Sequence, residues 1–428
     1  MTSEKKLPEG RFGRLRRLAG LGARTGASLL FSRDGGAAAA EKAAEVLGTL
    51  RGLAAKVGQM ASYVDGMVPD SHRDAYETAL RGLRAAAPTS SPEQIRHLVE
   101  EELKGPISEL FAEWDDVPLA SASIGQVHRA RMPDGRAVAV KVQHPGIAAA
   151  VESDLENAGM LQGLVATLGP RQLNSREVFN EIKQRFREEL DYQLEAERQT
   201  FFRKLHAGDP TIEIPAIVPE RSSGRVMTSD LKQGTSLEQA ATEPEALRRS
   251  YAETLWRFVF KGNLVGGMFN ADPHPGNYLF QPDGRIVFLD FGCVQPITGH
   301  HLTAARGAHR AAVRQDLPAF RQHIRDILGT QGGPYEEAML AYLRTTFEPL
   351  FGSPFHITRS YVKSLADGVL ELKQFILKGD SGFVPLQEEL IFMNRLQFGF
   401  YSVLARLDLP VDYATVEQHF FGAAGLAL

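Results

Sequence analysis

The sequence predicts an α+β protein whose β-strands lie in the middle of a mostly helical chain. Three stretches, 117–142, 212–228 and 278–289, contain short β-prone runs separated by turn residues, the pattern of strands and hairpins. The stretches before and after them carry apolar residues at helical spacing instead. With 428 residues, the chain is long enough for about two or three domains. We expect these segments: a basic tail at 1–35, a helical extension at 36–110, a β-rich lobe with a helical insert at 111–229, and a mostly helical lobe at 230–428.

Composition and charge narrow the class of protein. The net charge of −4 argues against a nucleic-acid-binding surface along the chain, so we expect no nucleic-acid partner. The only cysteine, Cys293, excludes an intramolecular disulfide and fits a reducing compartment. No apolar run reaches about 18 residues, so no transmembrane helix is expected. We expect a cytoplasmic protein. An organellar presequence is the weaker alternative, because Glu4 and Glu9 interrupt the arginine-rich start.

The arginine-rich start allows two interpretations. Residues 11–31 mix arginines with leucines, so a helix there would be basic and amphipathic and would contact an anionic membrane at its inner face. The four glycines of this stretch favour a disordered basic tail, since each interior glycine costs a helix about 1 kcal/mol relative to alanine. Both interpretations stay open.

The helical extension contains the sequence Lys-x-Gly-Gln at 56–59. An alanine-rich run at 37–65 predicts a helix, on which Lys56 and Gln59 share one face. Lys56 and Gln59 belong to a functional cluster in one interpretation. In the other, Lys56 is an exposed lysine and Gly58 only allows close packing. This stretch alone does not decide between them. A second helix is expected at 91–103, with a proline at its first position.

The first turn of the β-rich lobe consists of small residues. Small side chains let backbone N–H groups approach a phosphate, the task that glycines perform in other nucleotide loops. The alternative is a plain hairpin turn without a ligand. The residues of this candidate phosphate loop are Ala120, Ser121, Ala122, Ser123, Ile124 and Gly125.

A lysine inside an apolar strand indicates an anionic partner. Lys141 ends the sequence Val-Ala-Val-Lys, close to the pattern in which a strand lysine pairs with nucleotide phosphates. Because a buried unpaired ammonium is costly, Lys141 needs a carboxylate. We expect a helix at 175–205 to supply it through Glu195, with Asp191 on the same face at i, i+4. The alternative is that these acids and Glu189 form a solvated helix face.

Three polar residues accompany a predicted β-hairpin in the helical lobe. Asp272 and Asn277 precede its first strand, Asp290 follows its second, and a Pro-Asp-Gly turn at 282–284 joins the strands. Closing the hairpin would bring the two loops together. Two carboxylates and an amide oxygen converging in this way suit a hard cation such as Mg²⁺ held against phosphates.

The order of these features along the chain predicts a fold and two cofactors. A phosphate loop, a strand lysine, a helix glutamate, Asp-x₄-Asn and Asp-Phe-Gly follow one another in this order in protein kinases. We therefore expect a protein-kinase-like two-lobe fold, with an N-terminal helical extension and a mostly helical C-lobe. Such a site binds ATP with Mg²⁺.

Several longer motifs make the chain resemble the UbiB/AarF family of atypical kinases, over about residues 36–410. Lys-x-Gly-Gln is the N-terminal signature of that family. The other motifs are ASASIGQV at 120–127, VAVKVQHPG at 138–146, EELDYQLEA at 188–196, ADPHPGN at 271–277 and LDFG at 289–292.

The resemblance implies catalytic roles for the candidate residues. Lys141 would pair with Glu195 and hold the α- and β-phosphates of ATP. Asp272 would occupy the position of the catalytic base, and Asn277 and Asp290 would bind Mg²⁺. These roles agree with the chemistry of phosphoryl transfer, in which positioning of the reactants and electrostatic stabilisation supply most of the catalysis.

The resemblance also implies a covered site. The candidate phosphate loop would be the alanine-rich loop that this family has in place of a glycine-rich one. Glu189 and Asp191 would form the E-x-D motif of the family. Together with Lys56 and Gln59, this motif would lie over the place where a kinase accepts a peptide, as a regulatory acid–base cluster.

Departures from ordinary protein kinases narrow the expected substrate. Asp272 follows Asn-Ala rather than His-Arg. The arginine through which protein kinases respond to phosphorylation of the activation loop is therefore missing. After Asp-Phe-Gly the chain continues Cys-Val-Gln-Pro, without a following Ala-Pro-Glu, so we expect no peptide-docking activation segment. The paired C-terminal transmembrane helices of membrane-bound bacterial relatives are also missing from the sequence, so an anchor of that type is not expected.

These expectations give one leading function and two alternatives. The leading one is an ATP- and Mg²⁺-dependent atypical kinase or ATPase that supports ubiquinone (isoprenoid quinone) biosynthesis and is not a peptide kinase, with an isoprenoid lipid or quinone precursor as partner. The first alternative, drawn from the basic tail, is a nucleotide-gated lipid-binding or scaffolding protein with incidental ATPase activity. The second is a phosphotransferase of the aminoglycoside or choline type, which does not predict Lys-x-Gly-Gln.

Overall fold

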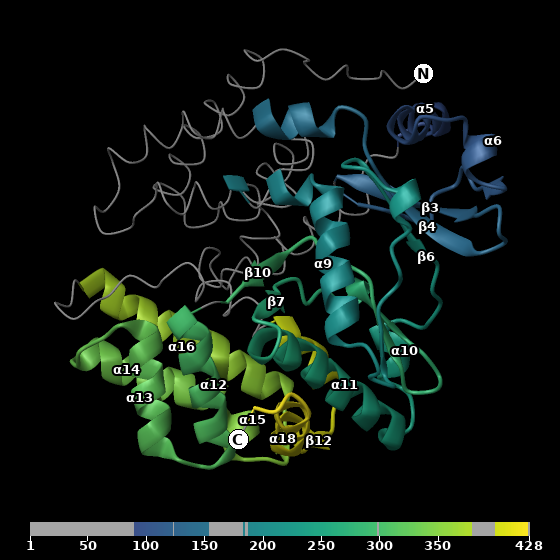
Figure 1. Ribbon diagram of the computed structural model, residues 1–428. Helices are drawn as coiled ribbons and strands as arrows, with labels where there is room; N and C mark the ends of the chain where they lie inside the picture. The colour runs from purple at the N-terminus through teal and green to yellow at the C-terminus, as the bar shows by residue number, and fades with distance from the viewer. Residues whose placement is uncertain are drawn as a thin grey trace, which may run out of the picture. The chain divides into compact units, whose positions relative to one another are not determined.

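The structure, a computed structural model, groups the chain into two compact units (Figure 1). The first unit comprises Met1–Gln193 and Val218–Thr228, and the second comprises Leu194–Ile217 and Ser229–Leu428. Helix α9 (Tyr192–Leu205) and strand β6 (Val226–Asp230) each begin in the first unit and end in the second. The residues that the structure describes are 90–122, 124–153, 183–184, 187–297, 299–378 and 399–426.

The first unit is built on a five-stranded sheet with the order β1-β3-β4-β6, in which β2 also pairs with β3. Strands β3 (Gly125–Arg131) and β4 (Ala137–Gln143) form an antiparallel hairpin. In its turn, Gly135 has a φ of +89°, which glycine adopts without strain. Strands β1 (Glu113–Trp114) and β2 (Ala120–Ser121) are short additions along β3. The strands and the turn predicted for 117–142 are confirmed.

Two helices, α5 (Pro92–Leu103) and α6 (Ile107–Leu110), pack against this sheet. As predicted, α5 begins with a proline in its first turn, and Ser91 and Gln94 form a capping box there, which satisfies two backbone N–H groups. Strand alternation places Val138, Val140 and Val142 in one core with the helices, and Lys141 on the opposite face of β4. The rest of this core consists of Ile95, Leu98, Val99, Ile107, Leu110, Phe111, Ala130, Met132, Val218 and Val226.

The core of the second unit surrounds α11 (Glu245–Leu264), a helix of 20 residues. The buried ring of Trp256 lies 4.2 Å from that of Tyr413, between ring centroids, and thereby contacts the last helix of the chain. The described residues of this unit are mostly helical, as expected for the C-lobe. Further helices in the described part of this unit are α10 (Leu237–Ala240), α12 (Gly299–Val313), α13 (Leu317–Leu328), α14 (Pro334–Thr346), α15 (Glu348–Phe351), α16 (Arg359–Lys378) and α18 (Tyr413–Ala423), and residues 399–407 are also helical.

The predicted hairpin of the second unit is present. Strands β8 (Tyr278–Phe280) and β9 (Ile286–Phe288) pair antiparallel, and Gly284 has a φ of +90° in the turn. Strand β5 (Ile212–Glu213) adds to β9 in parallel. Two further two-stranded sheets were not predicted: β7 (Met268–Asn270) with β10 (Val294–Pro296), and β11 (Phe355–His356) with β12 (Pro410–Val411).

The prediction of one continuous helix up to residue 205 is wrong. The described chain leaves the helical conformation at Leu190 and Asp191, and α9 begins at Tyr192. Neighbouring groups compete for the backbone there, since Gln143 Nε2 donates to the Leu190 oxygen at 2.6 Å and the Tyr192 N–H donates to the Gly224 oxygen at 3.1 Å. Asp191 therefore precedes the helix and does not share a helical face with Glu195.

None of the helices in the described ranges is both long enough and apolar enough to cross a membrane.

Candidate active site

The candidate phosphate loop is a tight turn in the first unit. Strand β2, its first part, pairs with β3, and the Ala122 N–H donates to the Gly125 oxygen at 2.8 Å. Ser123 lies outside the described residues. A Cβ on Gly125 would lie 2.5 Å from both the Tyr192 hydroxyl and the Val142 oxygen, so only glycine fits at this position.

Lys141 lies on β4, directly opposite Val127 of β3. It is half-buried, and its Nζ lies 5.0 Å from the ring centroid of the buried Tyr192, a distance typical of a cation–π contact. Tyr192 thus restrains the ammonium and also faces Gly125. Sequence reasoning missed this residue, although it lies inside the EELDYQLEA motif.

The candidate regulatory residues are described only in part. Lys56 and Gln59 lie outside the described residues, so their cluster with the E-x-D motif stays a prediction. Asp191 is exposed, and its Oδ1 accepts from the Gln193 N–H at 3.1 Å. An aspartate that caps a helix start in this way stabilises the first turn. Glu189 is half-buried on the short helical stretch that precedes it.

In the second unit, the hairpin brings the loop of Asp272 and Asn277 beside the strand that leads to Asp290. The Asn277 side-chain nitrogen donates to the Asp272 backbone oxygen at 3.2 Å, and the Leu289 N–H donates to the Asn277 oxygen at 3.0 Å. The Gly292 N–H donates to Asp290 Oδ1 at 2.9 Å and orients that carboxylate. All three predicted polar residues therefore belong to one pair of connected loops.

Asn270 connects these two loops through its side chain. Its Oδ1 accepts from the Asp272 N–H at 3.1 Å, while its Nδ2 donates to the Asp290 backbone oxygen at 2.6 Å. The pairing of β7 with β10, in which Asn270 lies opposite Val294, keeps the two chain segments adjacent. The sequence prediction treated this position only as a departure from His-Arg-Asp and missed its role.

One face of α9 contacts the Asp-Phe-Gly segment in the same unit. Arg198 donates to the Gly292 oxygen at 3.1 Å, and the ring of Phe202 lies 5.2 Å from that of Phe291, between centroids. The buried carboxylate of Glu195 is also close, because a Cβ on Gly292 would lie 3.7 Å from Glu195 Oε2. Helical spacing of three and four residues places these α9 side chains on one face.

Lys141 and Glu195 belong to different units. Their pairing therefore stays a prediction.

The comparison with known protein families decides the class of this molecule. Residues 82–323 match the model of the ABC1 atypical kinase-like domain. The chain belongs to the ABC1 atypical kinase-like family. Its relatives named COQ8 and UbiB place it in the UbiB/AarF group, as the sequence motifs predicted.

Individual relatives of this ABC1-family protein are named as kinases. It is 29% identical to the mitochondrial atypical kinase COQ8B of Rattus norvegicus, over 84% of this chain and 70% of that protein. It is 26% identical to the mitochondrial atypical kinase COQ8 of Saccharomyces cerevisiae, over 87% and 74% of the two chains. The probable protein kinase UbiB of Marinobacter nauticus is 30% identical over 70% of this chain and 55% of its own length. This chain is therefore an atypical kinase-like enzyme.

A solved structure supports the kinase-like α+β fold of the ABC1-family chain. It is the complex of Rv3197 with erythromycin from Mycobacterium tuberculosis, with a TM-score of 0.62 and 27% identity. The match covers 95% of this chain and 98% of that one.

The donor set in the second unit fits a phosphate-bound Mg²⁺. Such an ion takes one or two protein carboxylates and completes its shell with phosphate oxygens and water. The Asn277 amide nitrogen donates to the Asp272 backbone oxygen, so the amide oxygen is the end of this side chain that would bind a metal, and the Asp290 carboxylate would supply the charge. In the described ranges, no group of three or more histidine, cysteine or acidic side chains could hold a metal by itself.

Proposed function

We propose that this protein binds ATP with Mg²⁺ through Lys141, Asn277 and Asp290 and transfers or hydrolyses the terminal phosphoryl group. The observation that carries the proposal is the joined pair of loops in the second unit, in which Asn270 bonds both the Asp272 segment and the Asp290 segment. Electrostatic positioning of this kind is the main source of catalysis in phosphoryl transfer.

Each residue has a role that its surroundings support. The candidate phosphate loop presents backbone N–H groups to the phosphates, and Lys141, restrained beside Tyr192, holds their charge. Asp272 accepts the proton of the attacking hydroxyl or water. Bound Mg²⁺ supplies neutralisation of the charge that develops on the phosphate oxygens. Burial, reinforced by the negative charge of Asp272, raises the pKa of Tyr278 far above its usual range, so this phenol stays neutral next to the catalytic loop.

We infer that the phosphoryl acceptor is a small molecule and not a peptide. The residues after Asp-Phe-Gly form strand β10 and pair with β7, from Val294↔Asn270 to Pro296↔Met268. In protein kinases the corresponding segment is the activation loop. The sequence after this strand lacks the Ala-Pro-Glu of protein kinases, and this supports an acceptor other than a protein.

The relatives support a quinone-related role. Because the chain aligns with COQ8 and UbiB proteins, we infer that it supports biosynthesis of ubiquinone or a related isoprenoid quinone and acts beside an isoprenoid lipid or quinone precursor. Quinone profiling of a strain that lacks the gene tests this inference. Normal quinone levels would contradict the role in quinone biosynthesis, but they would not affect the assignment to the atypical kinases.

The metal assignment is tested by ATP turnover of Asp290→Asn. We expect turnover to fall by about a hundredfold, the typical effect of removing one group that stabilises the transition state. Asp283→Asn is the matched control, because Asp283 is an exposed aspartate in the turn of the same hairpin. Equal turnover in Asp290→Asn and in the wild type would contradict the assignment of Asp290 as a Mg²⁺ ligand.

The nucleotide-gated lipid-binding function is the second candidate, and the basic segment at 11–31 favours it. Co-sedimentation with anionic liposomes, with and without residues 1–35, separates it from the first. Lipid that neither binds the full chain nor changes its ATP turnover would remove this candidate. Contact with a membrane surface and the compartment of the protein stay predictions.

A further inference from the structure

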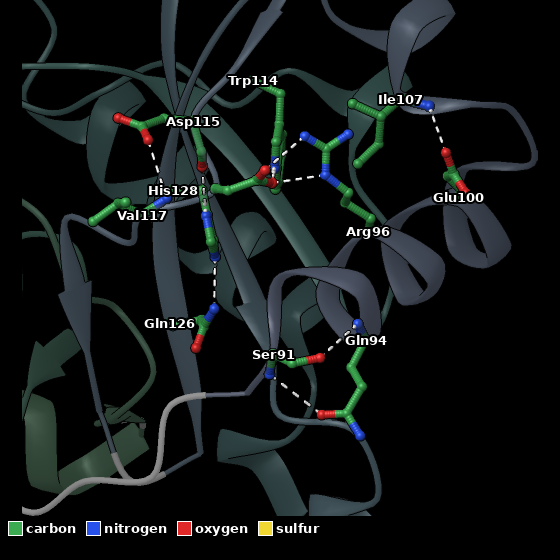
Figure 2. A network of polar contacts seen from close by, with 11 residues as sticks. Ser91, Gln94, Arg96, Glu100, Ile107, Trp114, Asp115, Val117, Gln126 and His128 are labelled. Atoms are coloured by element: carbon green, nitrogen blue, oxygen red, sulfur yellow. Dashed lines mark hydrogen bonds and ion pairs between the residues drawn. The ribbon is translucent and has the colours of Figure 1, made fainter.

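A chain of buried polar side chains lies beside the candidate phosphate loop in the first unit. Figure 2 shows one end of this chain, where the Gln126 amide nitrogen lies 2.7 Å from His128 Nε2, and His128 Nδ1 lies 2.8 Å from the Asp115 backbone oxygen. Gln126 and His128 are two residues apart on β3 and thus share a face of the sheet with Ala130, which packs in the core with α5. Their exposed fractions are 2% and 0%, so protein groups must satisfy their hydrogen bonds.

Ser90 extends this polar chain to the loop. Its N–H donates to Gln126 Oε1 at 3.2 Å, and its hydroxyl lies 2.9 Å from His144 Nδ1. His144 Nε2 in turn lies 3.0 Å from the Ala122 backbone oxygen. The five hydrogen bonds thus run from the Asp115 oxygen to the Ala122 oxygen. They hold residue 115, which precedes the candidate phosphate loop, and Ala122, which lies within it.

The two backbone oxygens at the ends fix the direction of these hydrogen bonds. A carbonyl only accepts, so His128 Nδ1 and His144 Nε2 each carry a proton. In neutral rings the other nitrogens accept, so the Gln126 amide donates to His128 and the Ser90 hydroxyl donates to His144. Burial lowers the pKa of His128, which agrees with a neutral ring. Each of the five hydrogen bonds therefore joins one donor to one acceptor.

His144 holds the candidate phosphate loop at two points. Its ring nitrogen donates to the Ala122 oxygen, and its backbone N–H donates to the Ile124 oxygen at 2.9 Å. Ala122 also donates to the Gly125 oxygen across the turn. Because a backbone carbonyl can turn only with its peptide plane, the bond to Ala122 restrains the peptide group that follows it.

We propose that Ser90 and His144 are positioning residues that set the conformation of the candidate phosphate loop and thereby the affinity for ATP. The proposal rests on the nucleotide function proposed above. Ser90 directly follows the stretch 36–89 of the predicted helical extension, and both its N–H and its hydroxyl are used in the polar chain. A displacement of Ser90 is therefore transmitted through His144 to Ala122, which connects the helical extension to the loop.

The test compares variants that break the polar chain with variants that keep it. Ser90→Ala and His144→Leu remove the link to Ala122. Ser90→Thr keeps the hydroxyl, and His144→Gln keeps a donor and an acceptor at the spacing of the two ring nitrogens. Ser91→Ala is the matched control, because the neighbouring serine caps α5 and takes no part in the polar chain (Figure 2).

Two measurements are made on the full chain. Hydrogen exchange of the peptide 117–127 in nucleotide-free protein is expected to accelerate about fivefold in Ser90→Ala and His144→Leu, the factor for loss of one hydrogen bond. The KM for ATP is expected to rise by about the same factor, with kcat nearly unchanged. Ser90→Thr, His144→Gln and Ser91→Ala should behave as wild type in both measurements, whatever Ser91→Ala does to the thermal stability of α5.

The outcomes separate this proposal from the proposed function. Unchanged exchange in folded Ser90→Ala and His144→Leu would overturn the positioning role, and so would faster exchange with an unchanged KM for ATP. Lys141→Met reports on the nucleotide function alone. If it leaves ATP binding intact, the assignment of Lys141 to ATP fails, while the exchange measurement still decides whether Ser90 and His144 hold the loop.

Discussion

Asn270 supplies one donor and one acceptor from a single amide, and both are used on catalytic loops. Alanine would leave the Asp272 N–H and the Asp290 oxygen without these bonds, and aspartate would keep only the acceptor. We expect Asn270→Ala and Asn270→Asp to lower ATP turnover by about tenfold or more, because small displacements of catalytic groups are costly.

Steady-state kinetics with the purified variants check this expectation. Asn263→Ala is the control, since Asn263 is a buried asparagine of α11 and lies in neither loop. Wild-type turnover in both Asn270 variants would show that the pairing of β7 with β10 suffices to align the loops.

His206 is a buried histidine whose ring nitrogens have no hydrogen-bond partner among the described residues. Its ring stacks 5.1 Å from that of Phe258, between centroids. Burial lowers the pKa of His206 to about 3, helped by the positive charges of Lys261 and Arg257 and opposed by Asp209. The folded protein therefore keeps this ring neutral at pH values where the unfolded chain, with a pKa near 6.5, binds a proton.

This difference makes stability depend on pH in a defined direction. The contribution of His206 is fully present above about pH 6.5 and is lost as the pH falls, by about 2 kcal/mol between pH 8 and pH 5. We expect His206→Phe to lose less of its free energy of unfolding over this range than the wild type. Urea unfolding at each pH measures the slope, with the exposed His97→Phe as control. Parallel curves for wild type and His206→Phe would contradict the neutral buried ring.

At the scale of elements, α18 is attached to α11 and α12 by a buried polar group. The carboxylate of Glu417, with an exposed fraction of 0%, accepts from Trp256 Nε1 at 3.1 Å and lies 3.0 Å from His309 Nδ1. We expect Glu417→Leu to destabilise the protein by about 3 kcal/mol, because it leaves two buried polar groups without their partner.

A double variant separates this pairing from the packing of α18. Glu417→Leu with His309→Leu should cost less than the sum of the single variants, since removing both partners of a buried pair is often nearly neutral. Glu337→Gln, which breaks an exposed pair with Arg321, should change the free energy of unfolding by about 0.5 kcal/mol at most. Additive losses in the double variant would show that Glu417 and His309 act independently.

The sequence predicted those elements whose signals are local. The β3–β4 and β8–β9 hairpins each contain a Pro-Asp-Gly turn, and α5 has a serine and a proline at its start. The break before Tyr192 was not predictable in this way, since its hydrogen bonds go to Gln143 and Gly224, which are distant in sequence. Strands β7 and β10, with three residues each, are too short for a periodic pattern.

At the scale of the molecule, the order of motifs predicted the family and the fold better than any element did. Asp272, Asn277 and Asp290 could be chosen as candidate site residues because the chemistry of phosphoryl transfer requires their residue types in this order. Asn270 and Tyr192 were missed because they act through other residues, by holding a loop and by restraining Lys141. Such positioning roles depend on contacts in space, and an asparagine or a tyrosine carries no chemical signal of its own.

Binding of ATP with Mg²⁺ should stabilise the whole protein by mass action. At a ligand concentration about a hundredfold above Kd, a ligand that binds only the folded state adds about 2.7 kcal/mol, enough to raise Tm by several degrees. We expect this shift in the wild type with ATP and Mg²⁺, and a much smaller one with ATP and EDTA or in Asp290→Asn. Thermal unfolding monitored by circular dichroism gives the three values. Equal shifts under all three conditions would mean that ATP binds without the metal site, because a nucleotide held through Mg²⁺ and Asp290 must lose affinity when either is removed.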